Sequence, residues 1–347
     1  MRLTSTSLLF SLPETLQQTP SSDAEDGDDD YEGDFIVTTG TPHPGWQPGD
    51  LQPHPYLDLK DEEGEDNGDG AATASDAEKA ERTRERVRKA LLAAPRHFVD
   101  PSKTAGSVLY PLVISAFVPR PIALVSTLSP STDEKTGKRS GNLAPFSYAG
   151  LVSHDPPHVA LGVCFTSGKP DRLKDTLYNI LETKEFVVNS TSSWFVESFN
   201  HTCGFFDRGV DELELAGLTP QASVRVAPPR VAEAAVQLEC RLVASHPVFS
   251  RSAAAAADGN GDGDGKGPPR TQTTTILIGE VVAFHVLEAV SSPTADGKSL
   301  VVDPVKLRPV CRLGGDTYGT LGRLFDLPRP GKEWQERRAA TRAAAKE

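Results

Sequence analysis

The sequence has few of the residues that build disulfide frameworks, zinc sites or membrane spans. It contains four cysteines in 347 residues, and no two of them form a C-x-x-C pair. This spacing fits neither a disulfide framework nor a zinc site, so we expect a reducing compartment, the cytoplasm. No run of about 18 apolar residues occurs, which argues against a membrane-spanning helix and a membrane partner. The apolar stretch at the start of the chain is too short for a secretory signal.

The chain is also short of basic and apolar residues. Lys and Arg number 36 against 48 Asp and Glu, which gives a net charge of −12, and hydrophobic residues make up 37%. Positions 1–100 hold 22 of the acidic residues and nine of the basic ones, so the rest of the chain is close to neutral. A nearly neutral folded part lacks the broad basic surface of a non-specific nucleic-acid binder. We therefore expect no nucleic-acid partner.

Composition divides the chain into four segments. Residues 1–74 alternate Pro, Gly and acidic clusters and cannot bury enough apolar area to offset their chain entropy, so they are predicted to be a disordered acidic tail. A capping box that begins at Ser75, followed by Pro95, predicts a surface helix over 75–95. Residues 110–320 form the predicted folded domain, which includes a low-complexity loop at 253–267. Residues 321–347 are predicted to be a charged C-terminal tail.

The folded domain is predicted to be mainly β with few helices. Short apolar runs separated by Pro and Gly predict strands at 113–118, 122–127, 159–165, 185–189, 236–242 and 274–287. The run 236–242 alternates cleanly, with Val236, Leu238, Cys240 and Leu242 on the apolar face. Helical periodicity predicts a helix over 171–183, and a second helix is predicted over 194–199. Many strands without βα alternation favour a closed, mostly antiparallel barrel.

Three kinds of catalytic site are disfavoured by the sequence. His154 and His158 have a metal-ligand spacing only on a helix, and the two prolines between them exclude that helix. No G-x-S-x-G motif for a nucleophilic serine occurs. No G-x-G-x-x-G follows a predicted strand, so a Rossmann dinucleotide-binding domain is not expected. We predict no metal site.

Nine short segments occur in an order that is typical of one protein family. They are Arg120–Thr127, Asn142–Ser147, Asp155–Pro157, Lys174–Ile180, Glu185–Asn189, Gly217–Thr219, Pro229–Val231, Gly279–Val281 and Arg312–Tyr318. Together they resemble the flavin reductase-like family, whose fold is the FMN-binding split β-barrel and which includes flavoredoxin. The resemblance covers residues 110–318 and implies that the cofactor is FMN.

The chemistry of FMN is consistent with these segments. Its phosphate requires hydroxyl groups, backbone N–H groups and a cation. Lys174, Asp175 and Thr176 open a predicted helix, where amide donors and the helix dipole favour an anion. The resemblance implies that Ser126, Thr127 and Ser167 add further hydroxyl donors. A solvated helix face is the alternative interpretation of Lys174 and Asp175.

The remaining segments are assigned to the flavin ring by the resemblance. The strip that runs along the ring edge would contain Asn142, Leu143, Ala144 and Ser147, and Pro145 would stiffen it. Arg312 and Tyr318 would lie near the flavin on the substrate side. Arg120, which stands between two prolines, is open to a flavin role or a structural one.

The resemblance implies a homodimeric oxidoreductase, specifically an NAD(P)H-dependent flavin reductase. Hydride passes directly from NADH or NADPH to flavin N5, and the protein supplies geometry and polarity, so the catalytic residues are unknown from the sequence. The nicotinamide would bind transiently, and flavin and nicotinamide are the expected small-molecule partners. Two alternatives stay open: a flavoredoxin-like electron carrier, and an FMN-dependent enzyme of specialised metabolism.

Overall fold

The computed structural model describes residues 36–38, 76–132, 134, 136–165, 173–250, 272–294, 296–325, 327 and 331. The chain divides into two units, one of Asp100–Leu321 and one of Met1–Val99 with Gly322–Glu347. The second unit contains α1 (Asp76–Ala93) and the parallel strand pair β1 (Ile36–Thr38) and β16 (Arg323–Phe325). Helix α1 occupies the segment predicted to be helical.

Several predictions fall on residues that the structure does not describe. These are the rest of the tail at 1–74, the loop at 253–267, Ser167, and residues 332–347 of the C-terminal tail. Within the segment predicted to be disordered, Ile36–Thr38 are extended and paired with β16.

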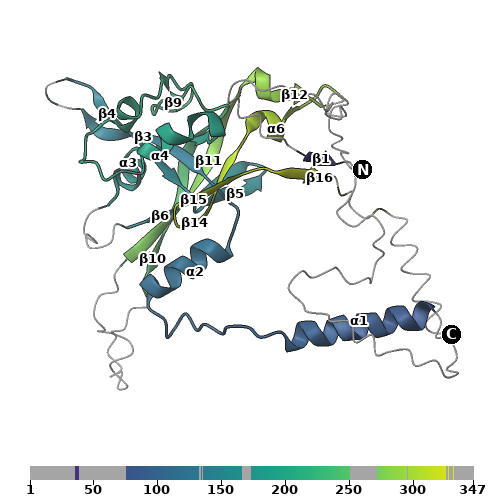
Figure 1. Cartoon of the computed structure of the whole chain (residues 1–347). Helices are drawn as coiled ribbons and strands as arrows, with labels where there is room; N and C mark the ends of the chain where they lie inside the picture. The colour runs from purple at the N-terminus through teal and green to yellow at the C-terminus, as the bar shows by residue number, and fades with distance from the viewer. Residues whose placement is uncertain are drawn as a thin grey trace, which may run out of the picture. The chain divides into compact units, whose positions relative to one another are not determined.

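Seven strands form the central sheet of the Asp100–Leu321 unit, in the order β4-β3-β7-β10-β11-β6-β5. Strands β3, β4, β5, β6, β10 and β11 can be found in Figure 1. Every neighbouring pair is antiparallel. The strands are β3 (Ala123–Thr132), β4 (Arg139–Phe146), β5 (Ala149–His154), β6 (Pro157–Cys164), β7 (Glu185–Ser190), β10 (Val236–Phe249) and β11 (Gln272–Val286). The edge strands β4 and β5 are joined by Ser147 and Tyr148, and the Tyr148 carbonyl accepts a 2.7 Å hydrogen bond from the amide of Gly162 on β6. The edges of the sheet therefore come together, and the predicted mainly β, antiparallel barrel is confirmed.

Strand β3 shows how the sheet separates two hydrophobic clusters. Ala123 and Val125 join a cluster that also contains Leu177 and Ile180 of helix α3 (Asp175–Thr183). Leu124 points the other way, into a cluster that the helices η2 (Ser193–Phe195), α4 (Val196–His201) and α5 (Glu212–Leu215) complete. Alternation along an extended strand places successive side chains on opposite faces. The helices predicted over 171–183 and 194–199 correspond to α3 and to η2 with α4.

The strand predicted over 113–118 is wrong. This segment belongs to α2 (Gly106–Ala116), a helix that contains Pro111. A short apolar, β-branched run cannot distinguish strand from buried helix by periodicity. Arg120 contacts the end of this helix: its guanidinium donates to the Ile114 carbonyl and, at 3.4 Å, to the Phe117 carbonyl. Arg120 is therefore structural, and it satisfies carbonyls that a helix end leaves without partners.

Two of the three polar residues on the polar face of β10, Gln237 and Glu239, are buried, contrary to what the alternating pattern suggests, whereas Arg241 is exposed. Gln237 and Glu239 are 5% and 0% exposed. The Glu239 carboxylate accepts hydrogen bonds from the amides of Val224, Arg225 and Val226, and from His285 Nε2 at 2.6 Å. A loop thus covers this face and supplies the donors that a buried carboxylate requires.

The remaining elements surround the barrel. A three-stranded sheet combines β2 (Arg120–Pro121), β14 (Val310–Gly314) and β15 (Thr317–Thr320), with Arg312 opposite Arg120. The short elements are β8 (Pro220–Gln221), β9 (Arg230–Val231), η4 (Glu288–Val290), β12 (Ser291–Pro293), β13 (Leu300–Val302) and α6 (Pro304–Leu307). No helix in the described part of the chain is both long enough and apolar enough to cross a membrane.

Candidate functional site

A cavity of about 370 Å³ lies where β4, α3 and the segment between α4 and α5 meet. Its lining residues are Asn142, Ala144, Pro145 and Phe146 of β4; Leu173, Lys174, Asp175 and Thr176 at the start of α3; the loop Thr202–Asp207; and Glu212 of α5. A volume of this size is within the usual range for small-molecule sites. The cavity thus brings together two segments that the sequence analysis assigned to FMN, the strip at 142–147 and the helix start at 174–176.

The N-terminal end of α3 opens onto this cavity. Lys174 is the residue before the helix, its backbone is extended, and no side chain in the described part of the chain caps the helix end there. The first amides of an α-helix have no partner within the helix, and the helix dipole adds partial positive charge. The Lys174 ammonium lies 5.9 Å from the centre of the Phe146 ring, and so adds a full positive charge to the same end of the cavity. This end of the cavity is suited to an anion.

The acidic residue in the first turn of α3 is paired with a cation. Asp175 Oδ1 accepts a 2.8 Å hydrogen bond from Arg208 Nε, and the Arg208 guanidinium lies 4.6 Å from the centre of the Tyr178 ring. Arg208 also donates to the Leu173 carbonyl. Because Arg208 neutralises Asp175, the carboxylate does not cancel the charge of Lys174.

Two consecutive residues of β4, Asn142 and Leu143, connect the strand to helices α3 and α5. Asn142 Nδ2 donates to Thr176 Oγ1 at 2.9 Å, and the Leu143 amide donates to Glu212 Oε2 at 3.0 Å. The preceding residue, Gly141, lies against α5, because a Cβ there would come within 2.7 Å of the Asp211 carboxylate. The hydroxyl of Thr176 accepts from Asn142 and keeps its own proton available for a second partner.

Glu212 is an acidic group within the cavity wall. Glu212 is only 9% exposed. Burial raises the pKa of the Glu212 carboxyl to about 7, against the hydrogen bond from Leu143, and the nearby carboxylates of Asp175 and Asp211 raise it further. A group that titrates near neutrality thus lies beside an end of the cavity that favours anions.

The loop Thr202–Asp207 forms the opposite wall. Phe206 packs against His201, with ring centres 5.7 Å apart, and a Cβ at Gly204 would come within 2.6 Å of the Phe206 ring. Burial raises the pKa of the Cys203 thiol, although the positive charges of Arg312 and Lys174 oppose this shift. These electrostatic effects show that Arg312 lies near the loop.

Five of the predicted site residues have other surroundings. Ser126 Oγ donates to the Pro229 carbonyl, Thr127 Oγ1 accepts from Asn179 at 3.0 Å, and Ser147 Oγ accepts from Arg120 Nε at 3.3 Å. The Leu143 side chain is in the hydrophobic cluster beneath α5, and Arg312 stacks on Tyr318 with its guanidinium 4.3 Å from the ring centre. None of these five is in the cavity lining, whereas Asn142, Ala144, Lys174, Asp175 and Thr176 are.

The sequence analysis missed Glu212 and the loop Thr202–Asp207. The loop carries no recognisable motif, and Glu212 is 69 residues from the amide that it accepts. Only the fold brings these residues to the cavity.

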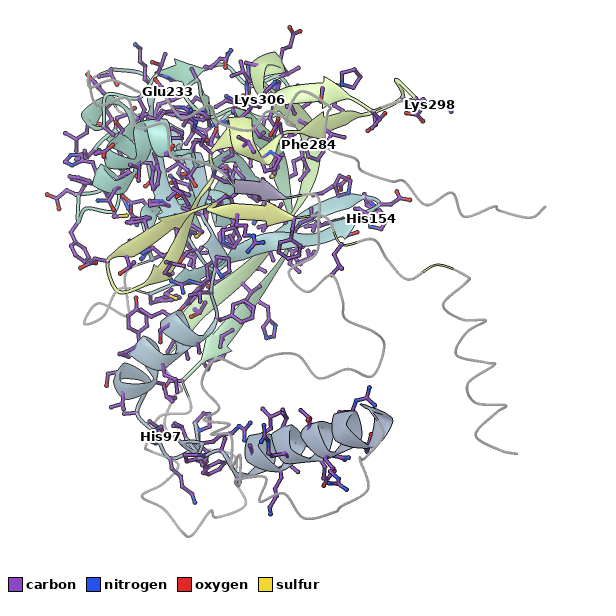
Figure 2. The ribbon with its side chains drawn as sticks, turned by 45° about the vertical axis from the view of Figure 1, so that its right-hand side comes forward. His97, His154, Glu233, Phe284, Lys298 and Lys306 are labelled. Atoms are coloured by element: carbon purple, nitrogen blue, oxygen red, sulfur yellow. The ribbon has the colours of Figure 1, made fainter. Side chains whose placement is uncertain are left out.

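The two histidines with metal-ligand spacing are on neighbouring strands. His154 ends β5 (Figure 2). His158 is in β6, where it pairs with Ser153. Within the described residues, no three His, Cys, Asp or Glu side chains are grouped as a metal site would require.

The topology of the barrel places this protein in the class of split-barrel proteins. A solved structure with a split barrel domain from Shewanella frigidimarina has a TM-score of 0.51 at 20% identity, covering 68% of this chain and 100% of that chain. This confirms the predicted split β-barrel.

Sequence comparison then gives the family. The family model "Flavin reductase like domain" matches residues 115–301, and the chain belongs to this family. An uncharacterized protein of Aquifex aeolicus is 36% identical over 217 residues, which are 62% of this chain and 91% of that protein. The structure of nitrilotriacetate monooxygenase component B from Bacillus cereus is 28% identical with a TM-score of 0.55, covering 68% of this chain and 100% of that one. The suspected family is confirmed, and it associates the protein with flavin-related redox chemistry.

Proposed function

We propose that the protein binds FMN in the cavity between β4, α3 and the loop Thr202–Asp207, and acts as an NAD(P)H-dependent flavin reductase. The observation that carries the proposal is the juxtaposition, in one cavity, of an anion-suited helix terminus with the β4 strip. Family membership supports the flavin as ligand.

The donor set at the start of α3 fits a phosphate group. It combines a cation (Lys174), a hydroxyl (Thr176) and the free amides of the first helical turn. Charge-assisted hydrogen bonds of this type are shorter and stronger than neutral ones. In this proposal Lys174 and Thr176 bind the phosphate, and Asn142 orients the Thr176 hydroxyl through its own hydrogen bond.

The β4 strip fits a planar ring with polar edges. Ala144 and Pro145 line the cavity with a small and a rigid side chain, and we propose that their backbone runs along the ring edge. The backbone of Leu143 and the hydroxyls of Ser126, Thr127, Ser147 and Ser167 remain predictions as flavin ligands. Arg312 and Tyr318, near the loop Thr202–Asp207, are proposed to border the substrate side.

When bound, FMN supplies the hydride acceptor. The chain's own contribution is to hold the ring along β4 and to leave room for a nicotinamide. We assign no residue of this chain as a proton donor for hydride transfer. The loop Thr202–Asp207 carries Phe205, which is 95% exposed and therefore available to contact a second substrate.

Anaerobic mixing of the FMN-loaded protein with NADH or NADPH tests the proposed activity. A reductase loses the oxidised-flavin absorption band within its turnover time and then reduces added free flavin catalytically. Persistence of the band with both nicotinamides, and its loss with dithionite, would instead identify an electron carrier. Slow bleaching that only an organic substrate accelerates would identify an enzyme of specialised metabolism.

We further propose that the protein is a homodimer in the cytoplasm. Helix α2 exposes large apolar side chains, including Val108, Tyr110 and Leu112, which are 66%, 58% and 47% exposed. An exposed apolar surface of this kind is typical of an interface. All four cysteines are free thiols, which supports a reducing compartment.

A further inference from the structure

Glu212 has the surroundings of a ligand-binding group. It is nine-tenths buried, it lines the cavity, and its Oε2 accepts the hydrogen bond from the Leu143 amide. The backbone amide of Glu212 itself donates a second hydrogen bond to the carboxyl group. Because Glu212 lines the cavity, its carboxyl group is within reach of a ligand bound there.

The charges around Glu212 determine which form of the carboxyl can face an anion. The titratable groups beside it are Lys174 and Asp175 of α3, Cys203 and Asp207 of the loop, Arg208, and Asp211 of α5. Arg208 pairs with Asp175, and the amides of Leu213 and Glu214 donate to Asp211. Glu212 accepts from two backbone amides, those of Leu143 and of Glu212 itself, and no ion pair compensates its charge in the described part of the chain.

A dianionic phosphate at the start of α3 would repel an ionised Glu212. Leu143 and Asn142 are adjacent on β4, and Asn142 contacts Thr176, so Glu212 is tied to the strand one residue away from the phosphate-binding helix start. A neutral carboxylic acid in the same position donates a hydrogen bond to a phosphate oxygen, and its other oxygen still accepts the Leu143 amide. Apolar surroundings can keep a carboxyl neutral at pH 7 for this purpose.

We propose that Glu212 is a ligand-binding residue of the cavity, and that it binds a phosphate oxygen as the neutral acid, through a hydrogen bond donated by its own carboxyl group. The inference rests on the proposed function, because it takes the ligand to be FMN. Its consequence is that binding takes up a proton wherever the free protein has Glu212 ionised.

The pH dependence follows in direction and size. The pKa of Glu212 in the free protein is about 7, so the carboxyl is mostly neutral at pH 6 and mostly ionised at pH 8. If only the neutral form binds, the apparent Kd for FMN rises about tenfold between these pH values. The phosphate of the ligand acts in the opposite direction, since its second pKa of about 6 makes it more dianionic at pH 8. A loss of affinity at high pH therefore comes from the protein.

The test measures FMN affinity at pH 6 and pH 8 for the wild type, E212Q and E214Q. Gln at 212 accepts from Leu143 and donates to the ligand at every pH, so E212Q should bind equally well at both pH values and about tenfold more tightly than the wild type at pH 8. E214Q, an exposed substitution on the same helix, should follow the wild type. Riboflavin, which lacks the phosphate, should bind the wild type with no such loss at pH 8.

A calorimetric readout keeps the failures apart. Calorimetry of the wild type in two buffers of different ionisation enthalpy should show about one proton taken up per FMN at pH 8, which tests the inference even if E212Q folds poorly. Parallel pH dependence in the wild type and E212Q, or no proton uptake, or the same loss with riboflavin, would overturn the role of Glu212. Absence of FMN binding at both pH values would reject the proposed function itself, and the inference with it.

Discussion

At the residue scale, the start of α3 brings different donors together over three positions. Lys174 supplies charge, Thr176 supplies a hydroxyl, and the backbone supplies amides that no side chain in the described part of the chain caps. Asp175 between them is not an obstacle, because Arg208 holds it at 2.8 Å. Anion binding at this end thus depends on neighbouring residues that do not themselves contact the anion.

Replacing Lys174 and Thr176 together by Ala should lower the affinity for FMN by at least tenfold. Each charge-assisted hydrogen bond is worth roughly 1.5–3 kcal/mol, and the double substitution removes both side chains. Fluorescence titration with FMN measures the change.

The matched control replaces Thr183 and Lys184, the same two residue types at the opposite end of α3, by Ala. It should leave the affinity unchanged. Equal affinities for wild type, test and control would place the phosphate elsewhere.

Glu239 is the residue with the clearest structural requirement for a negative charge. It is fully buried, yet three backbone amides and His285 donate to it. Burial opposes ionisation, but these hydrogen bonds prevail and hold the pKa of Glu239 below its usual value. Its contribution to stability is therefore present above the usual pKa of a glutamate and is lost as the pH falls through the lowered folded-state value.

The substitution Glu239→Gln should destabilise the fold by about 2 kcal/mol or more, because an amide NH₂ would face backbone donors. Urea denaturation at pH 7 measures this loss, which should shrink as the pH falls through the folded-state pKa. Glu280→Gln, on the neighbouring strand β11, is the control and should change stability little. A loss that is independent of pH in the acidic range would contradict the charge argument.

At the element scale, the register of β10 and β11 depends on one glycine. Gly279 pairs with Leu242, and a Cβ at Gly279 would come within 2.3 Å of the Phe186 ring. Phe186 is fully buried and is part of the cluster that includes α3. The ring therefore packs directly on the β11 backbone, which only glycine permits.

Gly279→Ala should cost about 1–3 kcal/mol of folding free energy, because the Phe186 ring must move within a packed core. Thermal or urea denaturation measures it. Gly150→Ala on β5 is the matched control, since nothing lies within 4 Å of its Cβ position. If both variants were equally stable, the close approach would not constrain β11.

At the scale of the whole molecule, a monomer would leave the exposed apolar side chains of α2 in contact with water. The proposed homodimer would cover them. Replacing Val108 and Leu112 by Glu should shift the protein from dimer to monomer, because it places charges on the apolar face. Light scattering of the variant measures the molecular mass in solution.

The control is the double variant Lys138→Glu and Lys298→Glu, which changes charge at exposed positions and should remain dimeric. A monomeric wild type would reject the proposal.

The sequence by itself determined the mainly β fold, most of the strands and the family. Strand alternation, proline and glycine positions and the helical period of α3 are local signals, and nine segments in one order identify the split barrel. The resemblance to the family placed Asn142, Ala144, Lys174, Asp175 and Thr176 among the candidate flavin-binding residues, and the structure gathers these five in one cavity.

Only the tertiary structure decided the rest. Residues 113–116 are helical, and Arg120 binds carbonyls at the end of this helix. Gln237 and Glu239 of β10 are buried, and the amides of residues 224–226 donate to Glu239. Glu212 is in the cavity because the Leu143 amide, 69 residues away, donates to it. These outcomes depend on contacts between different elements of the fold, and burial by such contacts sets both the partners and the pKa of each polar group. No pattern within one segment contains that information.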